Sequence, residues 1–113
     1  MPRLDDAIRI QYLIAAAEKA AAFAAGRDRA ALDEHELLRL GLVKLVEIIG
    51  EAAKQVSEPT RLAHPAVPWS AAARMRDRLV HHYFDINLDV LWATVTVELP
   101  KLLDLVPRPD ADL

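Results

Sequence analysis

The chain has 113 residues, which is enough for one hydrophobic core, so we expect a single domain over residues 1–113. Apolar residues make up 53% of the chain and aromatic residues only 5%, a balance that favours packed helices over a β-sandwich. The absence of cysteine excludes disulfides and thiolate metal sites, and the net charge of −3 argues against a general nucleic-acid binder.

The first six residues, Met-Pro-Arg-Leu-Asp-Asp, lack the apolar segment of a secretory signal. No apolar run in the chain approaches the ~20 residues that span a bilayer. We therefore expect a cytoplasmic protein without a membrane partner.

Hydrophobic periodicity predicts a first helix from about Leu4 to Ala25, closed by Gly26. Asp33 and Glu36 have the spacing of a capping box and predict the start of a second helix, which should run to about Ser57. Residues 27–32 and 60–67 are expected to form short connectors. Gly50 lies inside the second helix and predicts a close crossing with another helix.

A third helix should open at Pro68-Trp69 and end near Phe84. The fourth should run from Leu88 to about Leu105, with Asn87 as its N-cap and an interruption at Pro100. Short links between the four helices predict an antiparallel four-helix bundle.

The third helix carries the densest group of functional side chains, with three arginines, two histidines and a tyrosine in residues 74–84. On a helical wheel Arg76 falls on the apolar half, between Leu79 and Val80. An arginine in that position is costly unless it meets a carboxylate, an anion or an interface. Pairing with Glu47 or Glu51 is the structural alternative to a catalytic role.

The sequence gives no indication of a metal or a nucleotide cofactor. The four histidines, His35, His64, His81 and His82, lack the spacing to carboxylates found in helical metal sites, and the three glycines form no phosphate-binding loop. We therefore expect neither cofactor nor metal.

Metal-free cleavage of RNA suits the residues present. It needs a base for the 2′-hydroxyl proton, an acid for the leaving oxygen and a cation at the phosphate. Histidine can take either proton-transfer role and arginine offers a fork of donors to phosphate, so His81 and Arg76 are the candidates. Asp77 could orient the imidazole of His81, Arg74 and Arg78 could contact RNA backbone, and His82 is a neighbour that could assist binding.

One straight helix does not aim both Arg76 and His81 at one phosphate, because five residues correspond to about 140° of rotation. Either the helix frays after His81 or two protomers share a cleft about a two-fold axis. The second option also explains an arginine on an apolar face. We therefore expect a C2 homodimer.

The motif Arg76-x4-His81-x-Tyr83 resembles that of HepT-like toxins, a branch of the HEPN superfamily of helical ribonucleases. The likeness extends to the flanks, namely Glu47-Ile-Ile-Gly-Glu-Ala-Ala53, His64-Pro-x-x-Pro-Trp69, Met75–His81 with Tyr83-Phe84, and Leu88-x-x-Leu-Trp92. Asp77 stands where this family commonly has asparagine, which keeps a polar side chain but adds a charge.

The resemblance implies a homodimeric, metal-independent endoribonuclease that acts as the toxin of a type VII toxin–antitoxin pair. Its partner would be an MntA-like nucleotidyltransferase antitoxin that transfers AMP to Tyr83. Arg76 and His81 would then be catalytic. Two other interpretations remain open at this stage: a non-catalytic helical adaptor of a nucleotidyltransferase, and an unrelated four-helix bundle with an incidental basic patch.

Overall fold

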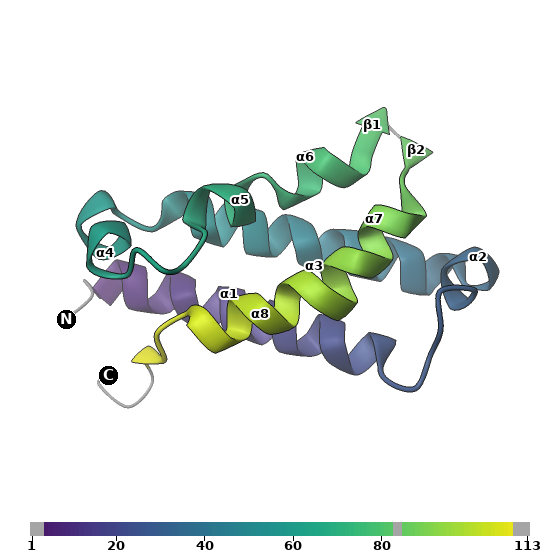
Figure 1. Ribbon diagram of the computed structural model, residues 1–113, viewed down its shortest axis with the longest axis horizontal. Coiled ribbons are helices and arrows are strands. Elements are labelled where there is room, and N and C mark those ends of the chain that lie inside the picture. Colours follow the sequence, from purple (N-terminus) through teal and green to yellow (C-terminus); the bar gives the residue numbers. More distant parts are fainter. Residues whose placement is uncertain (1–3, 83–84, 110–113) are drawn as a thin grey trace.

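The computed structural model describes residues 4–82 and 85–109 and shows an all-α fold with one very short hairpin (Figure 1). In chain order the elements are α1 (Leu4–Ala24), α2 (Ala31–Glu34), α3 (Glu36–Gln55), α4 (Glu58–Ala63), α5 (Trp69–Ala73), α6 (Met75–Leu79), β1 (Val80–His82), β2 (Asp85–Ile86), α7 (Leu88–Ala93), the π-helical turn η1 (Thr94–Glu98) and α8 (Leu99–Leu105). The predicted all-α class is confirmed.

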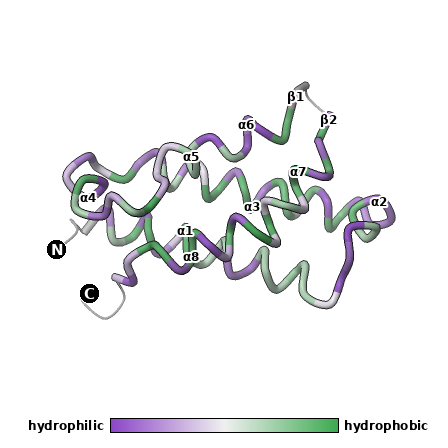
Figure 2. The backbone as a smooth tube through the Cα atoms, viewed as in Figure 1, coloured by the Kyte–Doolittle hydropathy of each residue, from purple (hydrophilic) through white to green (hydrophobic). Residues whose placement is uncertain are grey.

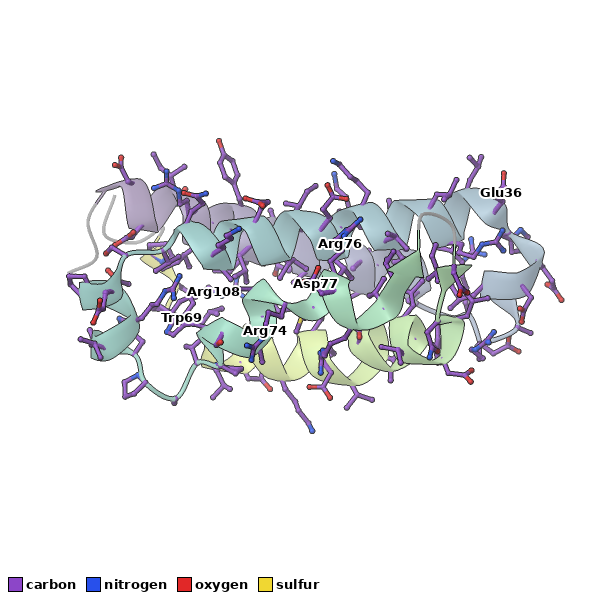
Figure 3. All side chains as sticks on the ribbon, turned by 90° about the horizontal axis from the view of Figure 1, so that it is seen from above. Glu36, Trp69, Arg74, Arg76, Asp77 and Arg108 are labelled. Atoms are coloured by element: carbon purple, nitrogen blue, oxygen red, sulfur yellow. The ribbon has the colours of Figure 1, made fainter. Side chains whose placement is uncertain are left out.

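The elements form two layers that pack face to face. α1 and α3 lie side by side in one layer, and the other holds α5–α6 and the continuous helix α7–η1–α8 (Figures 1 and 3). Hydrophobic residues recur along all the long helices (Figure 2), and the buried ones from both layers form one core. The largest fully buried side chains there are Ile10, Leu13, Leu32, Leu42, Val46, Ile49, Leu79, Leu91, Val95, Leu99 and Leu102.

α1 matches its prediction to within one residue, and Gly26 follows it with a φ of +72°, the left-handed conformation that ends helices. The predicted capping box is wrong. Asp33 lies inside α2, and α3 begins after His35, whose side chain makes no capping hydrogen bond. The carboxylate of Asp33 instead accepts a hydrogen bond from Arg29 at 2.8 Å.

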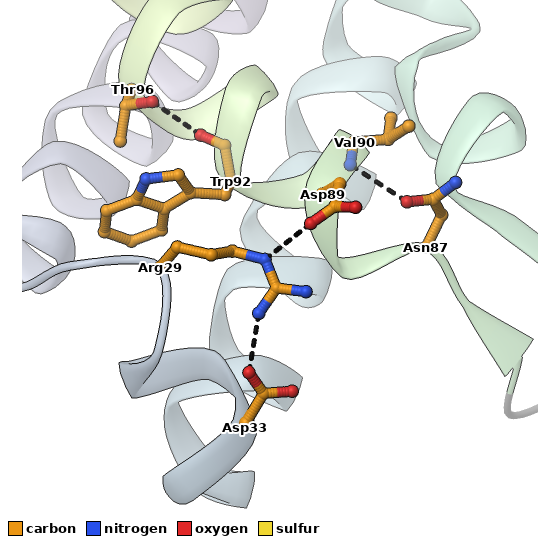
Figure 4. A network of polar contacts seen from close by, with 7 residues as sticks. All are labelled: Arg29, Asp33, Asn87, Asp89, Val90, Trp92 and Thr96. Atoms are coloured by element: carbon orange, nitrogen blue, oxygen red, sulfur yellow. Dashed lines mark hydrogen bonds and ion pairs between the residues drawn. The ribbon is translucent and has the colours of Figure 1, made fainter.

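Arg29 connects the α1–α2 link to the start of α7 (Figure 4). Its Nε donates to Asp89 at 2.8 Å while its Nη1 donates to Asp33. The hydrogen bond to Asp89 is the main cause that raises the pKa of Arg29 above its usual value. Two segments that are 60 residues apart in the sequence are thus joined at the surface.

A buried carboxylate fixes the other end of the bundle. Asp6 of α1 is 2% exposed, and it accepts hydrogen bonds from the backbone N–H and hydroxyl of Ser57 and from the hydroxyl of Thr60. Ser57 is the N-cap residue of α4, so the carboxylate of α1 stabilises the start of this short helix. Glu58-Pro59, expected to end the second helix, opens α4 instead.

The fourth predicted helix is present over its full length. Asn87 is its N-cap, and the side-chain oxygen accepts a hydrogen bond from Val90 N at 3.1 Å. Pro100 does not break the helix, because the turn before it widens into η1, where Leu99 N donates to the carbonyl of Thr94. The widened turn accommodates a residue that has no N–H to donate.

Candidate functional site

The motif segment is not one helix, as the sequence analysis expected. α5 ends at Ala73, Arg74 adopts φ −105° and ψ 8°, and α6 spans only Met75–Leu79. The chain then becomes extended at Val80, whereas the sequence predicted that the helix would continue to near Phe84. The helical wheel drawn for residues 69–84 therefore does not describe this segment.

The early end of α6 is explained by contacts with residues beyond the helix. The carbonyl of Leu79 accepts a hydrogen bond from the backbone N–H of Asn87 at 2.8 Å, so it bonds to the next helix rather than to its own. Val80 pairs with Ile86 across the hairpin, and both side chains pack against the core. β-branched residues favour this extended conformation.

α5 and α6 lie against α3 at its glycine. A Cβ atom on Gly50 would be 3.2 Å from the carbonyl oxygen of Ala73, so only glycine allows this close approach without adjustment. Met75 and Leu79 of α6 are buried beneath it. The predicted close helix crossing at Gly50 is confirmed, and its partner is the beginning of the motif segment.

Arg76 lies in the groove that this crossing forms. Its side chain is 49% exposed and reaches toward α3, whereas Arg74 lies farther from α3 (Figure 3). The groove has a volume of about 310 Å³ and is lined from the α3 side by Glu47, Gly50, Glu51 and Lys54, and from the other side by Ala73, Arg76 and Asp77. Arg76 is thus placed where a ligand could reach it.

The groove contains both charge signs. Arg76 and Lys54 supply two cations, and Glu47, Glu51 and Asp77 supply three carboxylates. In the described part of the chain, the ion pair of Arg76 is with Asp77 at 3.8 Å, which is near the upper limit for such a pair. Among the described residues, Arg76 forms no ion pair with Glu47 or Glu51, so the structural alternative is not supported.

The two glutamates and Lys54 were not among the predicted site residues. Glu47 and Glu51 lie one turn apart on α3, on either side of the helix crossing at Gly50. For Glu47 and Lys54 the sequence offered this information, because residues three or four positions from a crossing glycine lie on the same face of the helix. Glu47 also pairs with Lys44 at 3.6 Å.

The other predicted site residues are placed only in part. Arg74 and Arg78 are exposed and do not line the groove. The backbone of His81 and His82 forms β1. Their side chains and the whole of Tyr83 lie outside the described residues, so the catalytic and modification roles stay predictions.

Two tryptophans flank the segment. Trp69, at the start of α5, is 5% exposed, and its indole N–H donates to the carbonyl of His64 at 3.0 Å. Trp92 of α7 is half-buried against the core. Trp69 fixes the segment that leads into α5, which helps to set the position of the groove.

Two kinds of feature are absent from residues 4–82 and 85–109. These residues contain no group of three histidine, cysteine, aspartate or glutamate residues arranged to hold a metal ion. Among the same residues, no helix combines the length and the apolar character that crossing a bilayer requires.

Comparison with known proteins places this fold in a family. Residues 13–108 match the model of the family described as ribonuclease HepT-like. The chain belongs to the HepT-like family. The matched range includes α3, the groove and the motif segment.

Several curated proteins resemble the HepT-like chain at about 42% identity. One is named "Probable ribonuclease HepT", from Thermococcus cleftensis, and matches over 64 residues, which is 57% of this chain and 58% of that protein. Others, from Caldanaerobacter subterraneus and Methanocaldococcus jannaschii, carry names that mark them as candidate RNases, and match over 66 and 60 residues. These two matches cover 58% and 53% of this chain, and 59% and 50% of the respective relatives. The chain thus spans about half to three fifths of each relative. No solved structure matches it.

Proposed function

We propose that this HepT-like protein is a metal-independent endoribonuclease and the toxin of a type VII toxin–antitoxin pair. The observation that carries the proposal is the position of Arg76, half-exposed in a groove, within a segment that holds the family motif Arg76-x4-His81-x-Tyr83. The names of its relatives support the same activity.

In the proposed reaction, the 2′-oxygen of RNA attacks the adjacent phosphorus and the bond to the 5′-oxygen breaks. A base removes the 2′-hydroxyl proton, and an acid protonates the leaving oxygen. His81 takes one of these proton-transfer roles. Arg76 neutralises the charge that develops on the phosphate oxygens, and its planar fork of donors matches them.

The remaining motif residues act around these two. Asp77 lies beside Arg76 and shares its groove, so it can hold the guanidinium in place. Arg74 and Arg78 are exposed cations suited to the RNA backbone. His82 is the neighbour of His81 in the motif and would assist RNA binding. A homodimer would bring two copies of the motif to one shared cleft.

The proposed partner is an MntA-like nucleotidyltransferase antitoxin that transfers AMP to Tyr83. The phosphodiester of AMP would add negative charge and bulk two residues from His81. Both would hinder the approach of RNA. Modification of Tyr83 would therefore switch the toxin off without unfolding it.

One observation favours a second function. The groove of a single copy has three carboxylates against two cations, an excess of negative charge that disfavours binding of a phosphate chain. A non-catalytic helical adaptor of a nucleotidyltransferase would use the groove as a protein interface and would need no phosphate site. A ribonuclease needs the imidazole of His81, whereas an adaptor should tolerate its replacement.

The test is cleavage of total RNA by the purified, partner-free protein in EDTA, with intact mass recorded to detect an adduct on Tyr83. We expect the unmodified protein to cleave, and Arg76→Ala and His81→Ala to lose at least 100-fold in rate while remaining folded. Arg27→Ala is the matched control, because it removes an exposed arginine in the link between α1 and α2, outside the groove. An unmodified dimeric wild type without cleavage would favour the adaptor.

A further inference from the structure

Lys54 is the second cation of the groove that holds Arg76. It is exposed and belongs to the last turn of α3, whereas Arg76 comes from α6 on the opposite side of the groove. Among the described residues, Arg76 forms an ion pair with Asp77 at 3.8 Å, and no ion pair includes Lys54. An anion that enters the groove can therefore meet the ammonium of Lys54 without displacing a carboxylate.

The structural alternative for Lys54 is to neutralise the end of α3, because a cation is favoured where the last carbonyls of a helix lack partners. Arg61 already fills this role. Its Nε donates to the carbonyl of Val56 at 2.9 Å, and its Nη2 donates to the carbonyls of Ala53 and Lys54 at 3.2 Å and 2.8 Å. The same bonds fix the backbone of Lys54, so its side chain extends from a defined position.

Lys54 and Arg76 lie on opposite sides of the helix crossing. α3 and the segment α5–α6 run in opposite directions along each other and meet at Gly50 and Ala73 (Figure 1). Lys54 is four residues beyond Gly50, which is roughly 6 Å along α3, and Arg76 is three residues beyond Ala73, roughly 4–5 Å the other way. The two residues therefore start roughly 10 Å apart along the groove. This spacing suits two phosphates of one RNA strand better than a single phosphate.

The charge balance of the groove makes Lys54 important for such a ligand. Without it, Arg76 alone would face the carboxylates of Glu47, Glu51 and Asp77. Fixed negative charges oppose an RNA strand, whereas an ammonium beside a phosphate attracts it and releases counterions. Lysine suits this role because its flexible stem and three donors demand no exact geometry, unlike the planar fork of arginine.

We propose that Lys54 binds a phosphate next to the one that is cleaved, and so holds the RNA strand along the groove. This inference rests on the proposed function, because it concerns the same RNA site. Arg76 acts on the reacting phosphate, whereas Lys54 contacts a phosphate whose charge does not change in the reaction. Lys54 therefore contributes equally to the bound substrate and to the transition state, and its loss should raise KM and leave kcat nearly unchanged.

The experiment measures the affinity of the full chain for a short, labelled single-stranded RNA by fluorescence anisotropy, at salt concentrations from ~50 to ~200 mM. All proteins carry His81→Ala so that the RNA is not cleaved, and their intact mass is recorded. Lys54→Gln removes the charge, and Lys54→Arg keeps it. The control is Lys101→Gln, which removes an exposed lysine of α8 that does not line the groove. Thermal unfolding shows that each variant keeps the fold.

We expect Lys54→Gln to weaken binding by about three- to tenfold at the lowest salt. It should also reduce the slope of log Kd against log salt by ~0.7, the value for one phosphate contact on a single strand. Lys54→Arg should restore both quantities, and Lys101→Gln should change neither. In proteins that retain His81, Lys54→Gln should raise KM by a similar factor and leave kcat within about twofold.

A weaker affinity at an unchanged slope overturns the proposal, because the loss would then come from the fold rather than from a phosphate contact. Equal weakening by Lys54→Gln and Lys101→Gln also overturns it. Cleavage whose KM is the same in Lys54→Gln and wild type contradicts this inference alone. RNA that is bound through Lys54 but not cleaved by the unmodified wild type contradicts the ribonuclease alone, and an absence of RNA binding contradicts both.

Discussion

Gly50 and Ala73 bring the backbones of α3 and the motif segment close together, because a Cβ atom on Gly50 would lie 3.2 Å from the carbonyl oxygen of Ala73. The contact is between backbones, so no side chain can rotate to relieve it. It sets how far Arg76, three residues beyond Ala73, lies from the carboxylates of Glu47 and Glu51.

The first prediction compares two glycines of α3. Replacing glycine by alanine inside a helix adds about 1 kcal/mol of helix propensity. Gly41→Ala should show this gain, because its Cβ would meet the ring of Phe23 at an ordinary 3.6 Å. Gly50→Ala should be less stable than Gly41→Ala by about 1–2 kcal/mol, because α5 must shift. Urea unfolding of both variants measures the difference, and equal stabilities would contradict the prediction.

The second prediction concerns the buried carboxylate of α1. Asp6→Ala should lower the free energy of unfolding by about 2–4 kcal/mol, since it leaves Ser57 and Thr60 without their acceptor. Asp5→Ala is the matched control, because Asp5 is the exposed neighbour in the same turn. Its effect should stay within about 0.5 kcal/mol. Similar losses in the two variants would mean that helix-dipole effects, not the buried bonds, explain the cost.

The third prediction concerns the start of the last helix. Asn87→Ala should cost about 1 kcal/mol, because the backbone N–H of Val90 loses its capping oxygen. Asn87→Ser keeps a capping side chain and should restore most of the loss. Thermal unfolding compares the three proteins. Asn87 also donates its backbone N–H to Leu79, and this bond survives both substitutions.

The fourth prediction concerns the charge of the groove. If the groove receives RNA, Glu51→Gln should tighten RNA binding several-fold at low salt, because one of three carboxylates is removed. The gain should shrink as salt rises. Glu58→Gln on α4 removes an exposed carboxylate that does not line the groove and should change little. Weaker binding or slower cleavage by Glu51→Gln would instead assign Glu51 to the chemistry.

Local patterns predicted the long elements well. The periodicity of residues 4–25 predicted α1, Gly50 predicted the close crossing, and Asn87 predicted the cap of α7. Each of these three predictions was made from a residue and its neighbours in the sequence, so a local pattern was sufficient. The capping box failed because Asp33 bonds to Arg29, and Arg29 also reaches Asp89 from a distant part of the chain.

The sequence identified the residue types of the site correctly, but it predicted the wrong backbone geometry for the motif segment. The sequence identified Arg76, but a wheel drawn through residues 69–84 assumed a helix that breaks at Arg74 and ends at Leu79. What ends that helix is a bond from Leu79 to Asn87 and the pairing of Val80 with Ile86. These contacts form only when the hairpin closes, and no local sequence pattern predicts them.

The junction between α6 and β1 changes what the motif spacing means. Of the four residues between Arg76 and His81, Asp77, Arg78 and Leu79 are helical and Val80 belongs to the strand. The spacing of the motif is therefore not set by the period of a helix, because it includes three helical residues and one strand residue. A residue inserted in the helical part would rotate Arg76 by about 100° relative to the hairpin. One inserted in the strand would move the histidine position to the opposite face of the hairpin. Either insertion would change the orientation of position 76 relative to position 81 although the arginine and the histidine themselves are kept.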